Sequence, residues 1–158
     1  MRVLLSGYNG TMGQVLKNYI QDSTDLEIVA GVGRELLEEK FPTYTSYEGL
    51  EKVADVIIDF SHHAGTASLV EYAKRTATKV VIATTGHTTE ELELIDELAT
   101  HVGVVYAGNY SLGVNVLVEL VKKASELLLG YDIEVITKEN DKIFEILGID
   151  TNIDVNGD

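Results

Sequence analysis

Cysteine is absent from this chain of 158 residues, and proline occurs once. Without cysteine the protein forms neither disulfide bonds nor thiolate metal sites. One proline and 14 glycines indicate regular elements joined by short turns. No apolar run approaches the length of a membrane-spanning helix, and the apolar stretch at residues 1–5 is too short for a signal peptide. We therefore expect a cytoplasmic protein that has no membrane partner.

Basic residues are also scarce, because 12 lysines and arginines stand against 26 aspartates and glutamates, giving a net charge of −14. A chain with this charge repels nucleic acid unless its basic residues gather into a patch. The lysines and arginines are scattered along the sequence, so we expect no nucleic-acid partner. A ligand phosphate would have to be held by backbone amides and by the amino terminus of a helix.

The chain does contain a regular alternation of buried-strand and amphipathic-helix patterns. This alternation predicts an α/β fold with a doubly wound, mostly parallel, Rossmann-like sheet and helices on both faces. Ligands of such sheets bind at the carboxyl ends of the strands. Residues 34–40 are expected to form a short charged helix or a loop, residues 42–47 irregular structure and residues 47–53 a helical turn. The expected strands are residues 2–6, 26–32, 56–60, 79–83, 102–106 and 133–137, and the expected helices are residues 11–21, 64–76, 89–100 and 114–129.

The loop after the first expected strand has the spacing G-x-x-G-x-x-G. The first glycine allows the tight turn out of the strand, the second lets the backbone approach a pyrophosphate, and the third lets the helix pack closely on the sheet. Placed between a strand and a helix, this pattern predicts a dinucleotide-binding loop, and the alternative is a purely structural turn. The expected cofactor-binding residues of this loop are Gly7, Tyr8, Asn9, Gly10, Thr11, Met12 and Gly13.

The second expected strand ends in Val32-Gly33-Arg34-Glu35. At this position a carboxylate binds the adenosine ribose hydroxyls of NADH, whereas an arginine accepts the 2′-phosphate of NADPH. The sequence offers both groups, so the predicted cofactor is NADH or NADPH, with Arg34 among the residues that bind it. The alternative is a solvated surface pair.

Three further loops fall at carboxyl ends of expected strands. We expect Phe60 and Ser61 to lie near the nicotinamide ribose, and the hydroxyl-rich turn at residues 84–86 to contact the cofactor. His62 and His63 invite a metal hypothesis, but neighbouring side chains on an extended segment point in opposite directions, so no metal site is predicted. The remaining expected cofactor-binding residues are Thr84, Thr85, Gly86, Ala107, Asn109 and Ser111.

The end of the sequence alternates acids and amides. Asn152-x-Asp154-x-Asn156-Gly157 resembles the beginning of a calcium-binding loop. The later carboxylate of such a loop does not follow. We expect a polar, frayed end or a short strand instead of a calcium site.

Taken together, the loops resemble those of dihydrodipicolinate reductase, also called 4-hydroxy-tetrahydrodipicolinate reductase. They occur in the order of that family and at about its spacing, and they cover residues 1–138. The matching pieces are Gly7-x-x-Gly10-x-Met12-Gly13, Asp59-Phe60-Ser61, Thr84-Thr85-Gly86, Asn109-Tyr110-Ser111-x-Gly113-Val114-Asn115 and Tyr131-Asp132-Ile133-Glu134.

The resemblance implies a dinucleotide-binding domain at residues 1–138, followed by a substrate domain. A complete enzyme of the family transfers hydride from NADH or NADPH to an unsaturated cyclic dicarboxylate in the diaminopimelate pathway of lysine biosynthesis. Its substrate domain carries paired histidines, one of them the general acid, and a Pro-Ser-Gly-Thr loop. Here Lys138 is followed by Glu139-Asn140-Asp141-Lys142, and neither feature is present. Residues 139–158 are therefore expected to be a remnant or replacement of the substrate domain and carboxyl-terminal segment, and no catalytic residue is predicted.

Three functional hypotheses follow. The first is the nucleotide-binding domain of an oxidoreductase of this family, which binds cofactor with little or no turnover. The second is a non-catalytic nucleotide-binding module or a deliberately shortened chain. The third is another reductase on the same fold, with an active site formed by Asn109, Ser111 and His87. The resemblance implies a homo-oligomer in complete relatives, and a monomer or a weak dimer is equally open for this chain.

Overall fold

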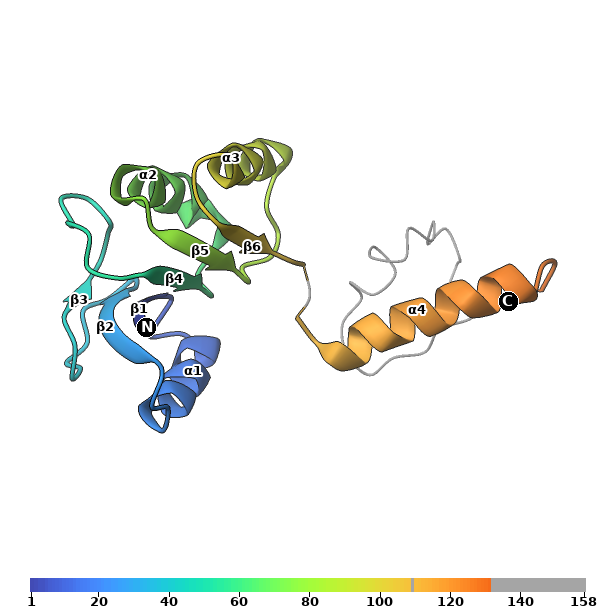
Figure 1. The fold of residues 1–158 in the computed structure, drawn as a ribbon, viewed down its shortest axis with the longest axis horizontal. Helices are drawn as coiled ribbons and strands as arrows, with labels where there is room; N and C mark the ends of the chain where they lie inside the picture. Colours follow the sequence, from blue (N-terminus) through green and yellow to red (C-terminus); the bar gives the residue numbers. More distant parts are fainter. Residues whose placement is uncertain (109, 132–158) are drawn as a thin grey trace, which may run out of the picture. The chain divides into compact units, whose positions relative to one another are not determined.

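A computed structural model describes residues 1–108 and 110–131 of the chain (Figure 1). The chain divides into two compact units, Met1–Gly108 and Asn109–Asp158. Each unit is described by itself, and they are called unit 1 and unit 2 below. The predicted domain boundary at residues 138 and 139 lies outside the described residues and stays a prediction.

Unit 1 contains a parallel β-sheet with the strand order β3-β2-β1-β4-β5-β6. Every strand pair of this sheet is parallel. The chain crosses from one half of the sheet to the other between β3 and β4, so the two halves diverge at the β1–β4 pair. The doubly wound α/β prediction is confirmed. The strands are β1 (Arg2–Ser6), β2 (Glu27–Val32), β3 (Thr43–Tyr44), β4 (Val56–Asp59), β5 (Lys79–Ile82) and β6 (Val104–Tyr106).

Helices cover both faces of this sheet (Figure 1). On one face α1 (Thr11–Gln21) packs Ile20 against Val3 and Val56. On the other face α2 (Thr66–Thr76) and α3 (Thr89–Ala99) contribute to the larger hydrophobic core of the unit. The side chains that α2 and α3 bury there are Leu69, Val70, Tyr72, Ala73, Ile95 and Leu98.

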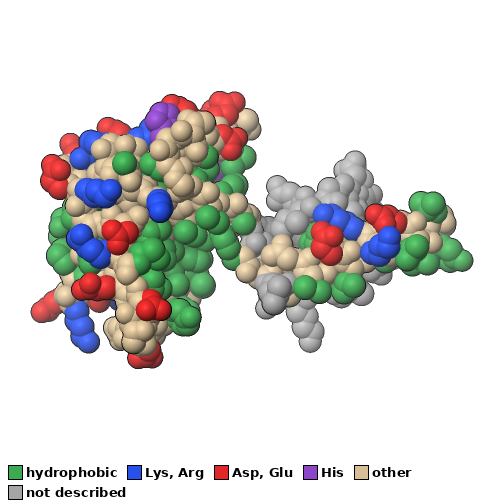
Figure 2. All heavy atoms as spheres, viewed as in Figure 1, with side chains coloured by type: hydrophobic (Ala, Val, Ile, Leu, Met, Phe, Trp, Pro, Cys, Tyr) green, Lys and Arg blue, Asp and Glu red, His purple; other side chains and the backbone are tan. Residues whose placement is uncertain are grey.

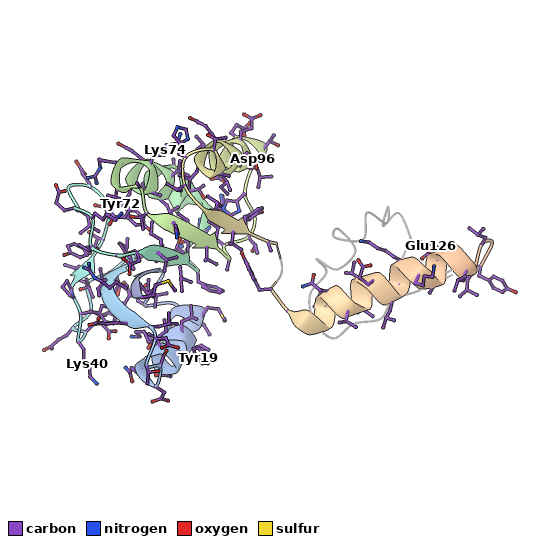
Figure 3. The ribbon with its side chains drawn as sticks, in the orientation of Figure 1. Tyr19, Lys40, Tyr72, Lys74, Asp96 and Glu126 are labelled. Atoms are coloured by element: carbon purple, nitrogen blue, oxygen red, sulfur yellow. The ribbon has the colours of Figure 1, made fainter. Side chains whose placement is uncertain are left out.

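A capping box begins α3, and the tyrosines of α1 and α2 differ in their burial. Thr88 precedes α3 as its N-cap and accepts a hydrogen bond from the Glu91 N–H, while the Glu91 side chain accepts one from the Thr88 N–H, which makes a capping box. Tyr72 on α2 is 1% exposed, and its Oη donates a hydrogen bond of 3.1 Å to the Glu51 carbonyl (Figure 3). Tyr19 on α1, in contrast, is 72% exposed.

The structure corrects the sequence prediction at three places. Residues 47–53 contain no helix but a single turn, in which the Leu50 N–H donates to the Tyr47 carbonyl at 3.2 Å. Residues 43 and 44 form β3, where irregular structure was expected, because Gly31 N–H and Gly33 N–H donate to the carbonyls of Pro42 and Tyr44, both at 2.9 Å. The helix expected over residues 64–76 begins as the 3-10 turn η1 (His63–Gly65) before α2. The strand expected at residues 133–137 lies outside the described residues.

Unit 2 contributes one described helix, α4 (Leu112–Leu127). The Oγ of Ser111 caps it by accepting a hydrogen bond of 3.3 Å from the Val114 N–H. In the described part of the chain, no helix is both long and apolar enough to cross a membrane. On the face of unit 1 shown in Figure 2, basic side chains are scattered among acidic and neutral ones and form no continuous patch.

Candidate functional site

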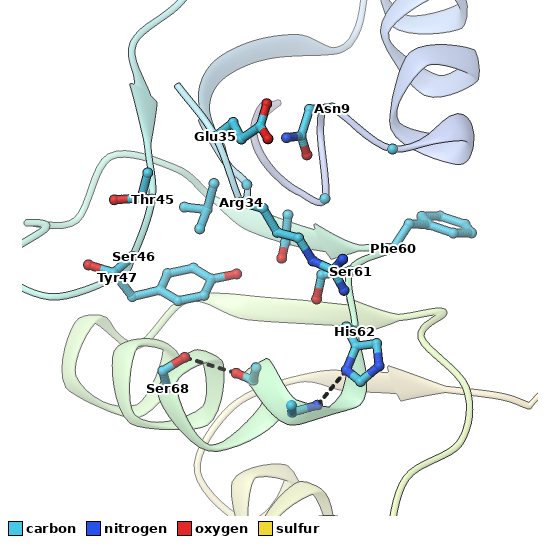
Figure 4. Close-up of a pocket in the computed structure, with 17 residues that line it drawn as sticks. Asn9, Arg34, Glu35, Thr45, Ser46, Tyr47, Phe60, Ser61, His62 and Ser68 are labelled. Carbon is cyan, nitrogen blue, oxygen red and sulfur yellow. Dashed lines mark hydrogen bonds between the residues drawn. The ribbon is translucent and has the colours of Figure 1, made fainter. Parts of the chain in front are cut away.

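A cleft of about 730 Å³ opens at the carboxyl ends of β1, β2 and β4 (Figure 4). This is the point where the strand order of the sheet reverses, and it is where α/β sheets of this kind bind ligands. The volume falls in the range typical of small-molecule sites. The lining residues come from the end of β1 and the loop after it, the end of β2 and the segment after it, the segment after β3, the turn between β4 and α2, and the first turn of α2. They are Ser6, Gly7, Asn9, Gly10, Val32, Gly33, Arg34, Glu35, Thr45, Ser46, Tyr47, Phe60, Ser61, His62, Ala64, Gly65 and Ser68.

The glycine loop is packed too closely to admit side chains at two of its positions. Gly7 has a φ of +77°, and a Cβ there would overlap the Phe60 carbonyl. A Cβ on Gly13 would overlap the Gly7 carbonyl and would lie 2.7 Å from the Tyr8 carbonyl carbon. Gly10 is the N-cap of α1 and offers no side-chain cap, so the first N–H groups of the helix are open to an acceptor from outside. This arrangement suits a ligand phosphate.

Apart from His62, the described charged side chains that line the cleft are Arg34 and Glu35, which directly follow β2. Arg34 extends across the cleft toward Ser61 and His62, while Glu35 lies beside Asn9 (Figure 4). Within residues 1–108 and 110–131, Arg34 forms no ion pair. Its guanidinium is therefore available to an anionic group of a ligand.

The same end of the cleft is also lined by hydroxyl-bearing residues that are not among the predicted cofactor-binding residues. Thr45, Ser46 and Tyr47 follow β3, and Ser68 lies in the first turn of α2. The Tyr47 ring points into the cleft (Figure 4) and is 6% exposed, and its Oη has no hydrogen-bond partner among the described residues. Burial raises the pKa of this hydroxyl, so it stays protonated, and its Oη is itself buried. The run Thr43-Tyr44-Thr45-Ser46-Tyr47 is rich in hydroxyl groups, but a strand of two residues leaves no alternating pattern, so the sequence predicts only irregular structure there.

A buried carboxylate connects two of the predicted loops. Asp59, at the end of β4, is 3% exposed. Its Oδ1 accepts a hydrogen bond from Ser61 Oγ, and its Oδ2 accepts one from Thr84 Oγ1, both at 2.6 Å. Asp59 thus holds the cleft residue Ser61 in place and ties it to the turn after β5.

We expect Asp59→Asn to lower the free energy of unfolding by about 1–3 kcal/mol, because the hydroxyl of either the buried Thr84 or the more exposed Ser61 would then face an amide NH₂ instead of an acceptor. Urea denaturation followed by circular dichroism measures this loss. Asp55→Asn is the matched control, since the exposed Asp55 carboxylate accepts one hydrogen bond from the Arg2 N–H and asparagine keeps an acceptor there. Equal stability of the two variants would contradict the role given to Asp59.

The adjacent histidines do not point in opposite directions, which corrects the sequence expectation. Their ring centroids are 4.3 Å apart, because the chain turns into η1 at His63 and no longer alternates as an extended segment does. His63 Nδ1 lies 3.0 Å from the Glu91 carboxylate. The pKa of Glu91 is lowered, mainly by the hydrogen bond from the Thr88 N–H and to a smaller extent by the one with His63. In the described part of the chain, no three His, Asp or Glu side chains are grouped so that they would hold a metal ion.

His87, a candidate for the third functional hypothesis, lies outside the cleft lining. Its ring packs edge-on against Tyr106, with centroids 5.5 Å apart, and burial lowers its pKa. Asn109 and the tail at residues 150–158 lie outside the described residues, and Ser111 belongs to unit 2. The third functional hypothesis therefore stays a prediction.

The cleft collects part of the predicted cofactor-binding set. Tyr8 is fully buried, Thr11 and Met12 are exposed at the start of α1, and Gly13 packs against the loop backbone. Their contact with a cofactor, and that of the residues outside the cleft, stays a prediction. The predicted residues that line the cleft are Gly7, Asn9, Gly10, Arg34, Phe60 and Ser61, and the other described ones, Thr84, Thr85, Gly86 and Ala107, lie outside its lining.

Comparison with known proteins gives a consistent result. A family model described as "Dihydrodipicolinate reductase, N-terminus" matches residues 1–110. The 4-hydroxy-tetrahydrodipicolinate reductase of Caldanaerobacter subterraneus subsp. tengcongensis is 39% identical over 140 residues, which are 89% of this chain and 56% of that protein. The enzyme of the same name from Clostridium tetani is 34% identical over 144 residues, covering 90% of this chain and 56% of that protein. The chain thus spans a little over half the length of these relatives.

Solved structures show the same fold. The dipicolinate-bound dihydrodipicolinate reductase of Paenisporosarcina sp. TG-14 has a TM-score of 0.64 and 21% identity, covering 79% of this chain and 53% of that one. The myo-inositol 2-dehydrogenase of Lactobacillus plantarum has a TM-score of 0.56 and 16% identity, covering 79% of this chain and 42% of that one. The second likeness shows that the sheet and its helices are shared more widely than one enzyme. With the family match over residues 1–110, the findings show that this chain belongs to the dihydrodipicolinate reductase family and corresponds to its amino-terminal, Rossmann-like nucleotide-binding part.

Proposed function

We propose that unit 1 binds NADH or NADPH in the cleft at the carboxyl ends of β1, β2 and β4. The observation that carries this proposal is the close packing of Gly7 and Gly13, which brings the loop backbone and the uncapped start of α1 to the edge of the cleft. A loop of this shape presents N–H donors to a pyrophosphate without a side chain in between. The net charge of −14 makes such local donors necessary.

The rest of the cleft fits the adenosine part of a dinucleotide. Arg34 supplies a cation for a 2′-phosphate, and Glu35 supplies an acceptor for ribose hydroxyls. The hydroxyls of Thr45 and Ser46 add neutral donors at the same end of the cleft. Because both charged groups are present, we propose that the site accepts either cofactor, with Arg34 favouring NADPH.

In a complete relative the cofactor would supply hydride to the cyclic dicarboxylate substrate of lysine biosynthesis, and the protein would position it. This chain carries no paired histidines after Glu134, and residues 139–158 supply one lysine, Lys142, as the only cation for a dicarboxylate. We propose that it binds cofactor with little or no turnover. The same absence supports the second candidate, a non-catalytic nucleotide-binding module.

Fluorescence titration of the purified chain with NADPH and NADH tests the binding proposal. We expect saturable binding of both cofactors with dissociation constants of about 1–100 µM, which correspond to roughly 5.5–8 kcal/mol of binding free energy. Binding of neither cofactor would contradict the proposal.

A reductase assay with the cyclic substrate then separates the enzyme from the binding module. We expect turnover of about 1% or less of that of a complete relative, because a general acid typically contributes a factor of about 100 or more. Turnover equal to that of the complete enzyme would contradict the proposed lack of activity.

A further inference from the structure

The second residue of the glycine loop, Tyr8, does not face the cleft. Its side chain is fully buried and runs beneath the stretch of residues 33–40 that follows β2. We call this stretch the ribose segment, because it carries Arg34 and Glu35 into the cleft. The segment contains neither helix nor strand, so its position depends on contacts with the rest of unit 1.

The hydroxyl of Tyr8 makes two hydrogen bonds to the backbone of the ribose segment. It donates to the Glu35 carbonyl at 2.7 Å and accepts from the Leu37 N–H at 2.9 Å. The ring itself lies against the end of β2, where a Cβ on Gly31 would be 2.8 Å from Tyr8 Cγ and a Cβ on Gly33 would be 2.7 Å from Tyr8 Cε1. Tyr8 therefore joins the phosphate loop, the end of β2 and the ribose segment.

A second contact fixes the far end of the same segment. Lys17 on α1 forms an ion pair with Glu39, and its side chain is 9% exposed. Lys17 Nζ also lies 5.9 Å from the centroid of the Tyr8 ring. Between these points, Thr43 Oγ1 donates a hydrogen bond of 3.1 Å to the Leu37 carbonyl. Two hydrogen bonds flank Arg34: the Gly33 N–H before it donates to the Tyr44 carbonyl at 2.9 Å, and the Tyr8 hydroxyl holds the Glu35 carbonyl after it.

We propose that Tyr8 is a positioning residue that fixes Arg34 and Glu35 relative to the phosphate loop and thereby sets discrimination between dinucleotides with and without a 2′-phosphate. This inference rests on the proposed cofactor site. A ligand held at its pyrophosphate gains from Arg34 only if the guanidinium is already at the right distance from the loop, since ordering a loose segment costs binding free energy. Without the hydroxyl, the Glu35 carbonyl and the Leu37 N–H lose their partner and the segment loosens.

Calorimetric titration with 2′,5′-ADP and 5′-ADP tests the proposal on the Tyr8→Phe variant, which keeps the buried ring. We expect the affinity for 2′,5′-ADP to fall about tenfold, which corresponds to roughly 1.4 kcal/mol, and the affinity for 5′-ADP to change less than about twofold. The matched control is Tyr72→Phe, which removes another buried hydroxyl bonded to a backbone carbonyl but lies on α2. An equal loss for both ligands, or the same selectivity change in Tyr72→Phe, would overturn the proposal.

Limited trypsin digestion tests the positioning step without any ligand. Trypsin cleaves after Arg34 and Lys40, which bracket the ribose segment, and after Lys52 and Lys79 elsewhere in unit 1. In Tyr8→Phe we expect cleavage at the first two sites to become several-fold faster, with the others unchanged. Unchanged cleavage at Arg34 and Lys40 would overturn the proposal even if both nucleotides bind. Failure of the wild-type chain to bind either nucleotide, with accelerated cleavage in the variant, would instead place the fault in the proposed cofactor site.

Discussion

Replacing Gly13 with alanine is expected to lower the free energy of unfolding by about 3 kcal/mol and the melting temperature by about 10 °C. The added Cβ would overlap the Gly7 carbonyl and would lie 2.7 Å from both the Cα and the carbonyl carbon of Tyr8. All of these are backbone atoms of a loop that is itself fixed by the hydrogen bond from Gly7 N–H to the Val32 carbonyl, at 2.8 Å. The helix would have to move away from the sheet. Differential scanning calorimetry measures the effect.

A matched glycine tests whether the cost arises from this contact. At Gly103 a new Cβ would find its nearest neighbour, Lys79 Cγ, at 3.6 Å, which is ordinary van der Waals contact. We expect Gly103→Ala to change the free energy of unfolding by about 0.5 kcal/mol or less. If Gly13→Ala melted at the temperature of Gly103→Ala, the close approach of α1 to the glycine loop would not exist in solution.

Replacing Arg34 with alanine is expected to weaken NADPH binding by about 30-fold while NADH binding changes about twofold or less. A charge-assisted hydrogen bond to a phosphate contributes about 1.5–3 kcal/mol, and 1.4 kcal/mol is a factor of ten. Arg34 lies across the cleft and has no ion-pair partner among the described residues, so its removal leaves no buried carboxylate behind. Fluorescence titration with both cofactors gives the ratio directly.

Lys40→Ala is the control for the loss of a positive charge. Lys40 belongs to the same ribose segment, is exposed and does not line the cleft. We expect this variant to retain the cofactor ratio of the wild type, and salt should reduce any small effect it has. A parallel loss of NADH and NADPH affinity in Arg34→Ala would mean that the arginine does not read the 2′-phosphate.

Much of the fold followed from the sequence because buried parallel strands and amphipathic helices leave strong local patterns. The strand expected at residues 56–60 and the helix expected at residues 89–100 both occur in the structure, each to within one residue. β3 could not be predicted in this way. It is two residues long, and what makes it a strand is backbone pairing with Gly31 and Gly33, a contact between distant residues that leaves no periodicity.

The site was predictable where a backbone requirement fixes the residue type. Gly7 and Gly13 are glycines because nothing larger fits, and a single sequence shows this through spacing alone. The contributions of Tyr8 and Tyr47 were not visible, since a tyrosine side chain can enter the core or a ligand site with the same local pattern. One of them is fully buried under the ribose segment, and the other points into the cleft. Only the path of residues 33–47 across the sheet decides between these outcomes.

The contact between the Tyr8 ring and the end of β2 also limits how this part of the protein can be changed. Gly31 and Gly33 leave the volume that the ring fills, so the three positions share one space although they belong to different elements. A chimera that took β2 from a relative with a larger side chain at residue 31 would need a small residue at position 8, and the ribose segment would then need a different anchor. Positions 8, 31 and 33 should therefore be exchanged together when segments are swapped between relatives that hold the adenosine end of the cofactor differently.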